Sequence, residues 1–266
     1  MKKAPVLLIG LLLGCAAPGM AAASSSRWAG VEGGAVRLVT TGAPEADGTL
    51  RGALQIDLKP GWKTYWLDPG DTGVSPRISV VGASLAKVAY PVAQRFDEGG
   101  TVWNGYEAPV SFAVALKVAG SEARDIKADV FLGICQSICI PLQAHLTLDP
   151  AADPQNADDA AAVTRAFEAV PASARPGFRL SDAERQGSEA LRVEAELPRP
   201  GSDAELFLAA PEGYAFGPPK QVSQTNGKAV FSVPVYDRPE AAAPGPEAAY
   251  TLVQNGEAVE GTVLLP

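Results

Sequence analysis

Short apolar runs, separated by glycine, proline and aspartate, recur at intervals of about ten residues along most of this chain. In residues 49–58 the leucine and isoleucine side chains fall on one face of an extended segment, as expected of a half-buried strand. Regular spacing of such runs predicts an all-β sandwich for the first half of the chain. The strands predicted there are residues 35–40, 49–58, 77–81, 84–90, 108–118, 126–134 and 140–148.

The strand pattern stops in the middle of the chain, where one helix is predicted. Residues 149–156 are rich in aspartate, proline and alanine and indicate a linker. In residues 158–169 and just beyond, Val163, Phe167 and Val170 form a single apolar stripe at helical spacing. The prolines at positions 171 and 176 end this helix.

Short strands return from residue 177 to the end of the chain, separated by strong turn signals. We therefore predict a mainly β chain in which a sandwich at 35–150 is followed by a linker with a short helix at 151–176. A second, smaller sandwich then occupies 177–266. Its predicted strands are residues 178–180, 190–197, 204–209, 229–235, 250–253 and 259–265, with a loop at 240–246.

The composition is that of a folded protein with an acidic surface. Hydrophobic residues make up 47% of the chain and charged residues 20%, which is typical of a globular protein. The formal net charge is −8, which argues against a nucleic-acid partner, because phosphate binding requires clustered lysine and arginine. No apolar run after the N-terminus reaches the length of a transmembrane helix, so we expect no span in the mature chain.

The N-terminus resembles an export signal. Lys2 and Lys3 precede an apolar stretch at 6–13, and the alanines at 21–23 offer a cleavage site, so residues 1–23 are predicted to be removed. Cys15 lies in a Leu-Leu-Gly-Cys sequence like a lipoprotein box, which leaves open whether it is discarded or lipid-anchors the protein. Either outcome removes Cys15 from redox chemistry. Export to the periplasm would allow disulfides to persist, and residues 24–34 are expected to form a flexible lead-in.

The exported part of the chain then holds two cysteines, Cys135 and Cys139, in an otherwise apolar run. Strand residues four apart are separated by about 13 Å, whereas a disulfide needs Cα atoms within about 7 Å. If the two cysteines pair, the chain must turn between them. Since strands are predicted on both sides, the simplest arrangement is a hairpin with the pair at its tip.

Spacing alone leaves three functions open for this pair. A structural disulfide closing so short a loop contributes only about 2 kcal/mol, against about 4 to 5 kcal/mol for a loop of a hundred residues. A copper or zinc site could use His145, the only histidine, but the apolar residues at 142, 144, 146 and 148 turn His145 to the opposite face. The third function is thiol–disulfide exchange. No Lys, Arg or His lies within four residues of either cysteine, so ordinary thiols are expected.

The segment 133–141, Gly-Ile-Cys-Gln-Ser-Ile-Cys-Ile-Pro, resembles the periplasmic N-terminal domain of the bacterial thiol:disulfide interchange protein DsbD. It is closest to the related copper-sensitivity-suppressor ScsB proteins, which share a Cys-x3-Cys-Ile-Pro pattern. The segments 60–71 and 90–97, together with Tyr106, resemble further parts of that family. The resemblance covers roughly residues 30–150, while residues 177–266 resemble only the ScsB branch.

The resemblance implies two immunoglobulin-like sandwiches and a redox carrier of the protein-disulfide reductase type, without metal or organic cofactor. Reducing equivalents would come from a membrane electron donor of the CcdA or DsbD type or from a thioredoxin-like protein. They would pass to periplasmic thiol oxidoreductases, with a link to copper tolerance or cytochrome c maturation. The alternative is a non-enzymatic periplasmic binding or scaffold protein with a structural disulfide.

The resemblance also assigns roles to individual residues. Cys135 and Cys139 would be catalytic, with Cys139 facing the partner. A mobile cap loop would shield them, with hinge freedom from the glycines at 99–100. The cap and its surroundings would comprise Phe96, Asp97, Glu98, Tyr65 and Tyr106. The residues alone also allow other roles: Phe96 could be a core residue, and Asp97 and Glu98 could form a solvated turn. They favour a core or sheet-face position for Tyr65, and Tyr106 could form a binding rim or pack a loop.

Overall fold

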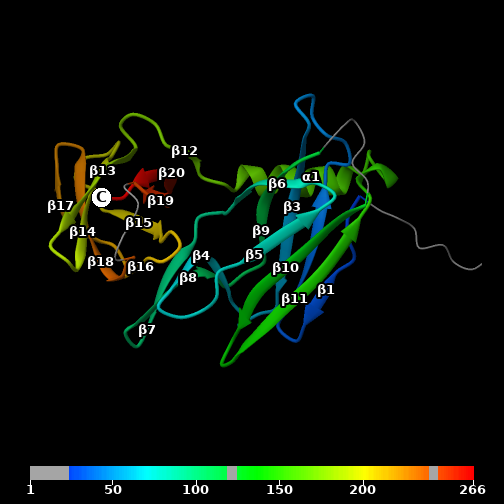
Figure 1. Cartoon of the computed structure of the whole chain (residues 1–266), viewed down its shortest axis with the longest axis horizontal. Helices are drawn as coiled ribbons and strands as arrows, with labels where there is room; N and C mark the ends of the chain where they lie inside the picture. The colour runs from blue at the N-terminus through cyan, green and yellow to red at the C-terminus, as the bar shows by residue number, and fades with distance from the viewer. Residues whose placement is uncertain (1–23, 119–124, 240–244) are drawn as a thin grey trace, which may run out of the picture.

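The computed structural model describes residues 24–118, 125–239 and 245–266. The predicted export signal, Cys15 and most of the predicted loop at 240–246 lie outside these residues. The described chain consists mainly of strands, with one α-helix and one short 3-10 helix, η1 (Pro150–Ala152). The prediction of a mainly β fold is therefore confirmed (Figure 1).

Two sheets packed face to face form the first sandwich. Its core contains Leu54, Phe112, Leu132 and Leu146, each of which is almost fully buried. One sheet has the order β1 (Ala29–Val31), β2 (Gly34–Thr40), β3 (Thr49–Leu58), β9 (Val110–Lys117) and β6 (Ser84–Ala89). The other has the order β11 (Cys139–Leu148), β10 (Ile126–Cys135) and β5 (Arg77–Val81).

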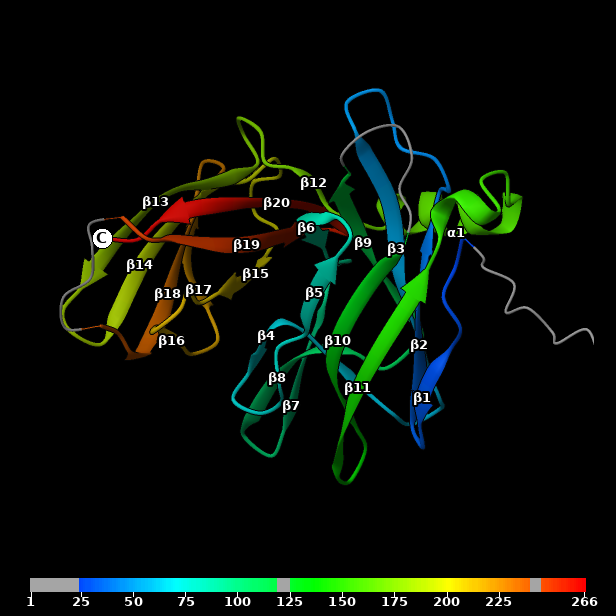
Figure 2. The same ribbon diagram turned by 45° about the vertical axis from the view of Figure 1, so that its right-hand side comes forward.

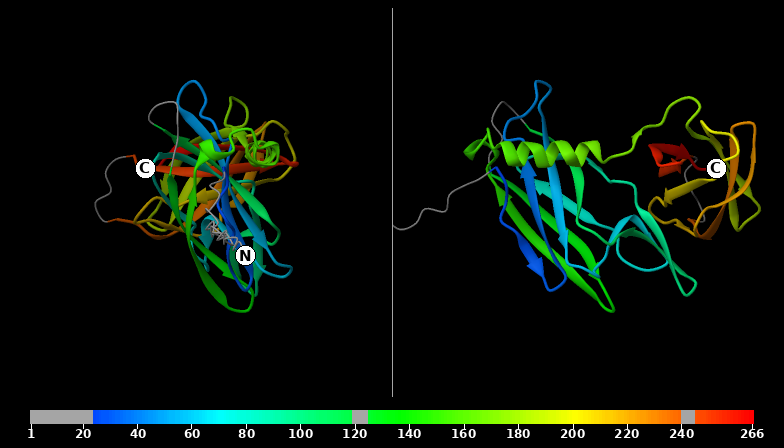
Figure 3. Two further views of the ribbon diagram at one scale, coloured as in Figure 1. Left: turned by 90° about the vertical axis from the view of Figure 1, so that its right-hand side faces the viewer. Right: turned by 180° about the vertical axis from the view of Figure 1, so that it is seen from behind.

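A small third sheet flanks the first sandwich on the side that faces the rest of the chain (Figure 1). Its order is β4 (Thr64–Gly70), β8 (Thr101–Tyr106) and β7 (Gln94–Glu98). The tips of the β7–β8 and β10–β11 hairpins point toward the same end of the molecule (Figures 2 and 3). This sheet was not predicted from the sequence, and it supplies much of the candidate site.

The helix α1 (Ala157–Glu168) packs on the first sandwich and leads toward the second (Figure 3). The side chain of Asn156 caps its N-terminus by accepting a hydrogen bond from the Asp159 backbone N–H. Ala162, Val163 and Ala166 bury its apolar side against the sheet that contains β2, β3 and β9. The predicted helix therefore lies within about one residue of its expected position.

The expected flexible lead-in at 24–34 is part of the fold instead. Residues 29–31 form β1, which pairs with β2. Ser24 and Ser26 are buried, and the Ser24 hydroxyl donates a hydrogen bond of 2.8 Å to Asp159 of α1. Small, polar residues suggested flexibility, but the hydroxyl groups of both serines are hydrogen-bonded, since that of Ser26 accepts from the Leu38 backbone N–H.

The second sandwich has its own core, which includes Phe178, Leu206, Phe231 and Leu252. One sheet has the order β12 (Ala172–Ser173), β20 (Glu257–Leu264), β19 (Glu247–Gln254) and β15 (Ala204–Ala209). The other has the order β13 (Arg179–Gln186), β14 (Ala190–Glu196), β18 (Lys228–Asp237) and β16 (Ala215–Phe216), and β17 (Lys220–Thr225) also pairs with β18.

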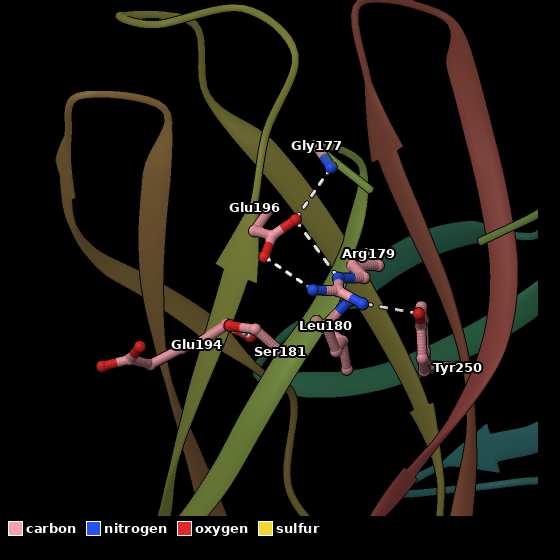
Figure 4. A network of polar contacts seen from close by, with 7 residues as sticks. All are labelled: Gly177, Arg179, Leu180, Ser181, Glu194, Glu196 and Tyr250. Carbon is pink, nitrogen blue, oxygen red and sulfur yellow. Dashed lines mark hydrogen bonds and ion pairs between the residues drawn. The ribbon is translucent and has the colours of Figure 1, made fainter. Parts of the chain in front are cut away.

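A polar cluster joins the two sheets of the second sandwich near the linker (Figure 4). Arg179 donates two hydrogen bonds to the carboxylate of Glu196, which also accepts one from the Gly177 backbone N–H. The backbone N–H of Leu180 donates to the hydroxyl of Tyr250 on the facing sheet, at 3.1 Å. The cluster joins β13 to β14 in its own sheet and to β19 in the facing sheet.

Candidate functional site

The two cysteines lie at the tip of the β10–β11 hairpin, where they are directly opposite each other. They form a disulfide, with a Cα–Cα distance of 4.0 Å. Three residues make the turn, and the Gln136 backbone N–H donates to the carbonyl of Ile138 at 3.0 Å. This geometry confirms the predicted hairpin and places the disulfide at an end of the molecule rather than between its sheets.

The two ends of the disulfide have different surroundings. Cys135 is only 1% exposed, whereas Cys139 is an exposed residue. The side chain of Ile138 beside it is 68% exposed, which is unusual for a large apolar residue. An approaching molecule would therefore meet Cys139 first, with an apolar side chain next to it.

Tyr65, in β4, contacts the exposed end of the disulfide. Its hydroxyl oxygen lies 3.6 Å from the Cys139 sulfur, and it is the donor in this contact because a disulfide sulfur carries no hydrogen. Burial of the phenol raises the pKa of Tyr65, and the negative charge of Glu98 adds to the effect. The hydroxyl therefore keeps its proton at neutral pH and can donate to sulfur.

Aromatic side chains cover the buried end of the disulfide. Tyr65, Trp103 and Cys135 form one buried cluster, and Phe96 packs against it. Trp103 meets the Tyr65 ring edge-on, with centroids 6.0 Å apart, and stacks on Phe96 at 3.9 Å. The edge-on contact between Tyr65 and Trp103 is of the kind that aromatic pairs favour. We call Phe96 and Trp103, which face each other across β7 and β8, the aromatic cover.

A lysine connects the cover to the cysteine strand. The ammonium group of Lys63 lies 2.7 Å from the carboxylate of Glu98 and 4.1 Å from the centre of the Trp103 ring. The same Glu98 oxygen accepts a hydrogen bond from the Trp103 indole N–H at 2.9 Å. These hydrogen bonds, from Lys63 first and then Trp103, lower the pKa of Glu98.

The tip of the β7–β8 hairpin is a tight turn. The Asp97 side chain accepts a hydrogen bond of 2.7 Å from the Gly100 backbone N–H. Gly99 and Gly100 both have positive φ values, 67° and 91°, which glycine adopts without strain. Asp97 therefore closes the turn, while Glu98 ties it to Lys63.

The structure brings most of the predicted site residues together but leaves Tyr106 apart from them. Tyr106 packs against Phe112 in the core and donates a hydrogen bond to the Pro91 carbonyl, away from the disulfide cluster. His145 has an exposed side chain beside Asp129, as its strand phase predicted. Within the described ranges, no group of three potential metal ligands is found.

Two residues of the site were not among the predicted ones. Trp103 could only be interpreted as a rim or packing residue, because nothing in the sequence links it to the cysteines. Lys63 is 72 positions from Cys135 in sequence, and only the tertiary fold brings the two backbones together.

In the part of the chain that the structure describes, no helix is both long and apolar enough to cross a bilayer.

Comparisons with known proteins agree with this arrangement. Residues 37–151 match the family described as thiol:disulfide interchange protein DsbD, N-terminal. The crystal structure of the N-terminal periplasmic domain of ScsB from Proteus mirabilis aligns with a TM-score of 0.72 and 22% identity, covering 91% of this chain and 98% of that one. This likeness establishes a shared fold across both sandwiches. A comparison with curated protein sequences produced no significant match. Residues 37–151 therefore form a domain of the DsbD N-terminal family.

Proposed function

We propose that this protein is a periplasmic carrier of reducing equivalents, which it passes to thiol oxidoreductases through Cys135 and Cys139. The observation that carries the proposal is the asymmetry of the disulfide, with Cys139 exposed and Cys135 buried beneath aromatic side chains. Exchange needs one sulfur that a partner can reach and a second that is protected until it resolves the mixed disulfide.

The reaction follows from these positions. In the reduced protein the Cys139 thiolate attacks a sulfur of the partner disulfide, forms a mixed disulfide and releases one partner thiolate. The Cys135 thiolate then attacks the Cys139 sulfur, which breaks the mixed disulfide and releases the second partner thiolate. The partner disulfide is reduced, and the pair on this chain is oxidised to the bond between Cys135 and Cys139.

Tyr65 would assist at the attacking sulfur. Its hydroxyl lies close to Cys139 and remains protonated, so it can stabilise a thiolate there by donating a hydrogen bond. The aromatic cover and the Lys63–Glu98 pair would keep Cys135 away from stray oxidants and thiols until a partner docks. In this proposal Phe96, Asp97 and Glu98 form the cap, while Tyr106 supports it only through the core.

The electron donor would be a membrane protein of the CcdA or DsbD type or a thioredoxin-like protein, and the acceptors would be periplasmic thiol oxidoreductases. Exposed Ile138 beside Cys139 offers the apolar contact that such a partner needs around its own cysteine. Whether the carrier serves copper tolerance or cytochrome c maturation depends on which periplasmic oxidoreductase it reduces. The second sandwich extends the surface available to these partners.

Redox titration against glutathione tests the proposal directly. A carrier should have a midpoint potential near about −200 mV, whereas a structural disulfide typically lies below about −300 mV. A midpoint in the lower range would contradict the carrier function and favour a binding protein with a static disulfide.

Trapping tests the order of attack independently. With Cys135→Ser, Cys139 can attack but the mixed disulfide cannot be resolved, so an adduct with a periplasmic oxidoreductase should accumulate. Cys139→Ser is the matched control, because its remaining thiol is buried and should form much less adduct. Equal trapping by both variants would contradict the assigned order, and no adduct from either would contradict the exchange reaction.

A further inference from the structure

The second sandwich contacts the first at the base of the β7–β8 hairpin, where one arginine carries most of the polar contact. The Arg95 side chain is only 17% exposed. It donates a hydrogen bond of 2.8 Å to the carbonyl of Leu206 and lies 3.2 Å from the carboxylate of Glu205. Its guanidinium carbon is 4.6 Å from the centre of the Phe207 ring. Three consecutive residues of β15 therefore hold one side chain of β7.

Neighbouring strands of the small sheet are joined to the same part of the second sandwich. Arg95 donates to the side-chain oxygen of Asn104 in β8, and Asn104 donates to the backbone carbonyl of Asp68 in β4. The Asp68 carboxylate accepts from the backbone N–H of Ala210 at 3.2 Å. These contacts link all three strands of the small sheet, β4, β7 and β8, to the segment that follows β15. The second sandwich therefore holds the small sheet in place as a unit.

Apolar packing supports these hydrogen bonds. The rings of Trp66 and Phe207 meet edge-on with centroids 5.7 Å apart. Phe207 and Ala209 belong to the core of the first sandwich even though they lie in β15 of the second. Figure 1 shows the small sheet lying between the two sandwiches.

The position of Arg95 along β7 connects this contact to the disulfide. Arg95 is opposite Asn104, and the next pair along the two strands is Phe96 and Trp103. Successive strand residues are only about 3.3 Å apart, so a shift of the Arg95 backbone is transmitted to the cover. Trp103 in turn packs with Tyr65 and Cys135 in one buried cluster.

We propose that the second sandwich positions the aromatic cover over Cys135 through Arg95 and thereby sets how readily the disulfide is exposed. Arg95 is a positioning residue in this proposal, since it acts through Phe96 and Trp103. The importance of this control for electron transfer rests on the proposed function. The effect of Arg95 on the accessibility of the disulfide is a property of the folded, oxidised chain and can be measured without a partner.

The test is the rate at which a small phosphine reductant, tris(2-carboxyethyl)phosphine, opens the disulfide of the oxidised full chain under native conditions. Arg95→Met removes the charge and the hydrogen bonds and should accelerate reduction about tenfold. Glu205→Gln, in the other sandwich, removes one ion-pair partner and should accelerate it about threefold. Arg37→Met is the matched control, because Arg37 lies over Trp28, at a site separate from the cover, and the rate should not change.

Two measurements separate positioning from general loss of stability. Arg95→Lys keeps the charge near Glu205 and should give an intermediate rate. Addition of low urea should change the rates little, because only a local opening is needed, whereas global unfolding would make them strongly urea-dependent. If Arg95→Met does not fold, Glu205→Gln and Arg95→Lys still test the proposal.

Unchanged rates in Glu205→Gln and in the folded Arg95 variants would overturn the proposal, as would rates that merely follow global stability. Failure of the proposed carrier function would give a different set of results. In that case the midpoint potential would lie in the range of structural disulfides or no mixed disulfide would form, while reduction rates would still differ among the Arg95 and Glu205 variants.

Discussion

Lys63 and Cys135 face each other across a single antiparallel bridge between the segment preceding β4 and the end of β10. The Lys63 backbone N–H donates to the Cys135 carbonyl at 2.8 Å, and the Cys135 backbone N–H donates to the Lys63 carbonyl at 2.9 Å. One residue further, the Thr64 hydroxyl donates to the Gly133 carbonyl. Tyr65 follows and contacts Cys139. Lys63, Thr64 and Tyr65 thus place the lysine and the phenol next to the disulfide.

The first prediction concerns the side chain of Lys63. Lys63→Met keeps the backbone bridge but removes the ion pair with Glu98 and the contact with the Trp103 ring. Partly exposed interactions of these kinds are each worth roughly 1 kcal/mol or less. We expect the disulfide to be reduced about three to ten times faster in a phosphine time course.

The exposed Lys59 offers a matched control for this substitution, since its side chain does not belong to the cluster around the disulfide. Lys59→Met should react at the wild-type rate. Similar acceleration by both substitutions would show that net charge, rather than the tie to Glu98, determines access to the disulfide.

The second prediction concerns the hydroxyl of Tyr65. Tyr65→Phe keeps the ring that packs on Trp103 but removes the donor near Cys139. A hydrogen bond of this kind contributes about 1 kcal/mol, so the Cys139 thiolate of the reduced protein should be less stabilised and alkylation should begin only at higher pH. The pH dependence of iodoacetamide alkylation in Cys135→Ser, with and without Tyr65→Phe, measures this shift. An identical alkylation profile would exclude thiolate stabilisation by Tyr65.

The third prediction concerns the effect of low pH on access to the disulfide. Hydrogen bonds from Lys63 and Trp103 lower the pKa of Glu98 from its ordinary value of 4.5. Because the pKa is lower in the folded state, the stabilisation from this group is fully present above the ordinary value and is lost as pH falls through the lowered pKa. Access to the disulfide should therefore increase only at pH values below this ordinary value of 4.5.

Glu98→Gln provides the comparison for the acid experiment. It cannot ionise, so its phosphine reduction rate should already be raised at pH 6. The ratio of its rate to the wild-type rate should fall toward one as the pH is lowered to about 3, which cancels the pH dependence of the reductant itself. A ratio that stays constant over this range would contradict a role for the Glu98 charge in holding the cover.

Much of the sandwich architecture could be predicted because burial on one face imposes a period of two. The structure places strands at Thr49–Leu58, Arg77–Val81 and Ala204–Ala209, the same bounds as the predicted ones. The strand β17 was missed because its sequence, Lys-Gln-Val-Ser-Gln-Thr, has no apolar alternation to detect. Its position depends on pairing with β18 rather than on burial of one face.

The candidate site was less predictable than the fold. The hairpin of the cysteines follows from local spacing, but the small sheet does not. β4 ends in Asp-Pro-Gly, and Gly99-Gly100 separates β7 from β8, so both regions are rich in turn signals. The contacts of Lys63 and Arg95 join segments far apart in sequence, and only the three-dimensional packing selects those two cations from the 22 in the chain.

The last prediction concerns the contribution of the disulfide to stability, which separates a working redox pair from a structural bond. The loop between Cys135 and Cys139 is so short that closing it should stabilise the folded state by only about 2 kcal/mol. Urea denaturation of the oxidised and reduced protein should therefore give unfolding free energies that differ by about this amount. The double variant Cys135→Ser, Cys139→Ser, measured without reductant, controls for effects of the reductant. A loss of about 5 kcal/mol or more, or unfolding on reduction, would mean that the fold depends on this bond, as expected of a structural disulfide rather than of one that opens in each cycle of exchange.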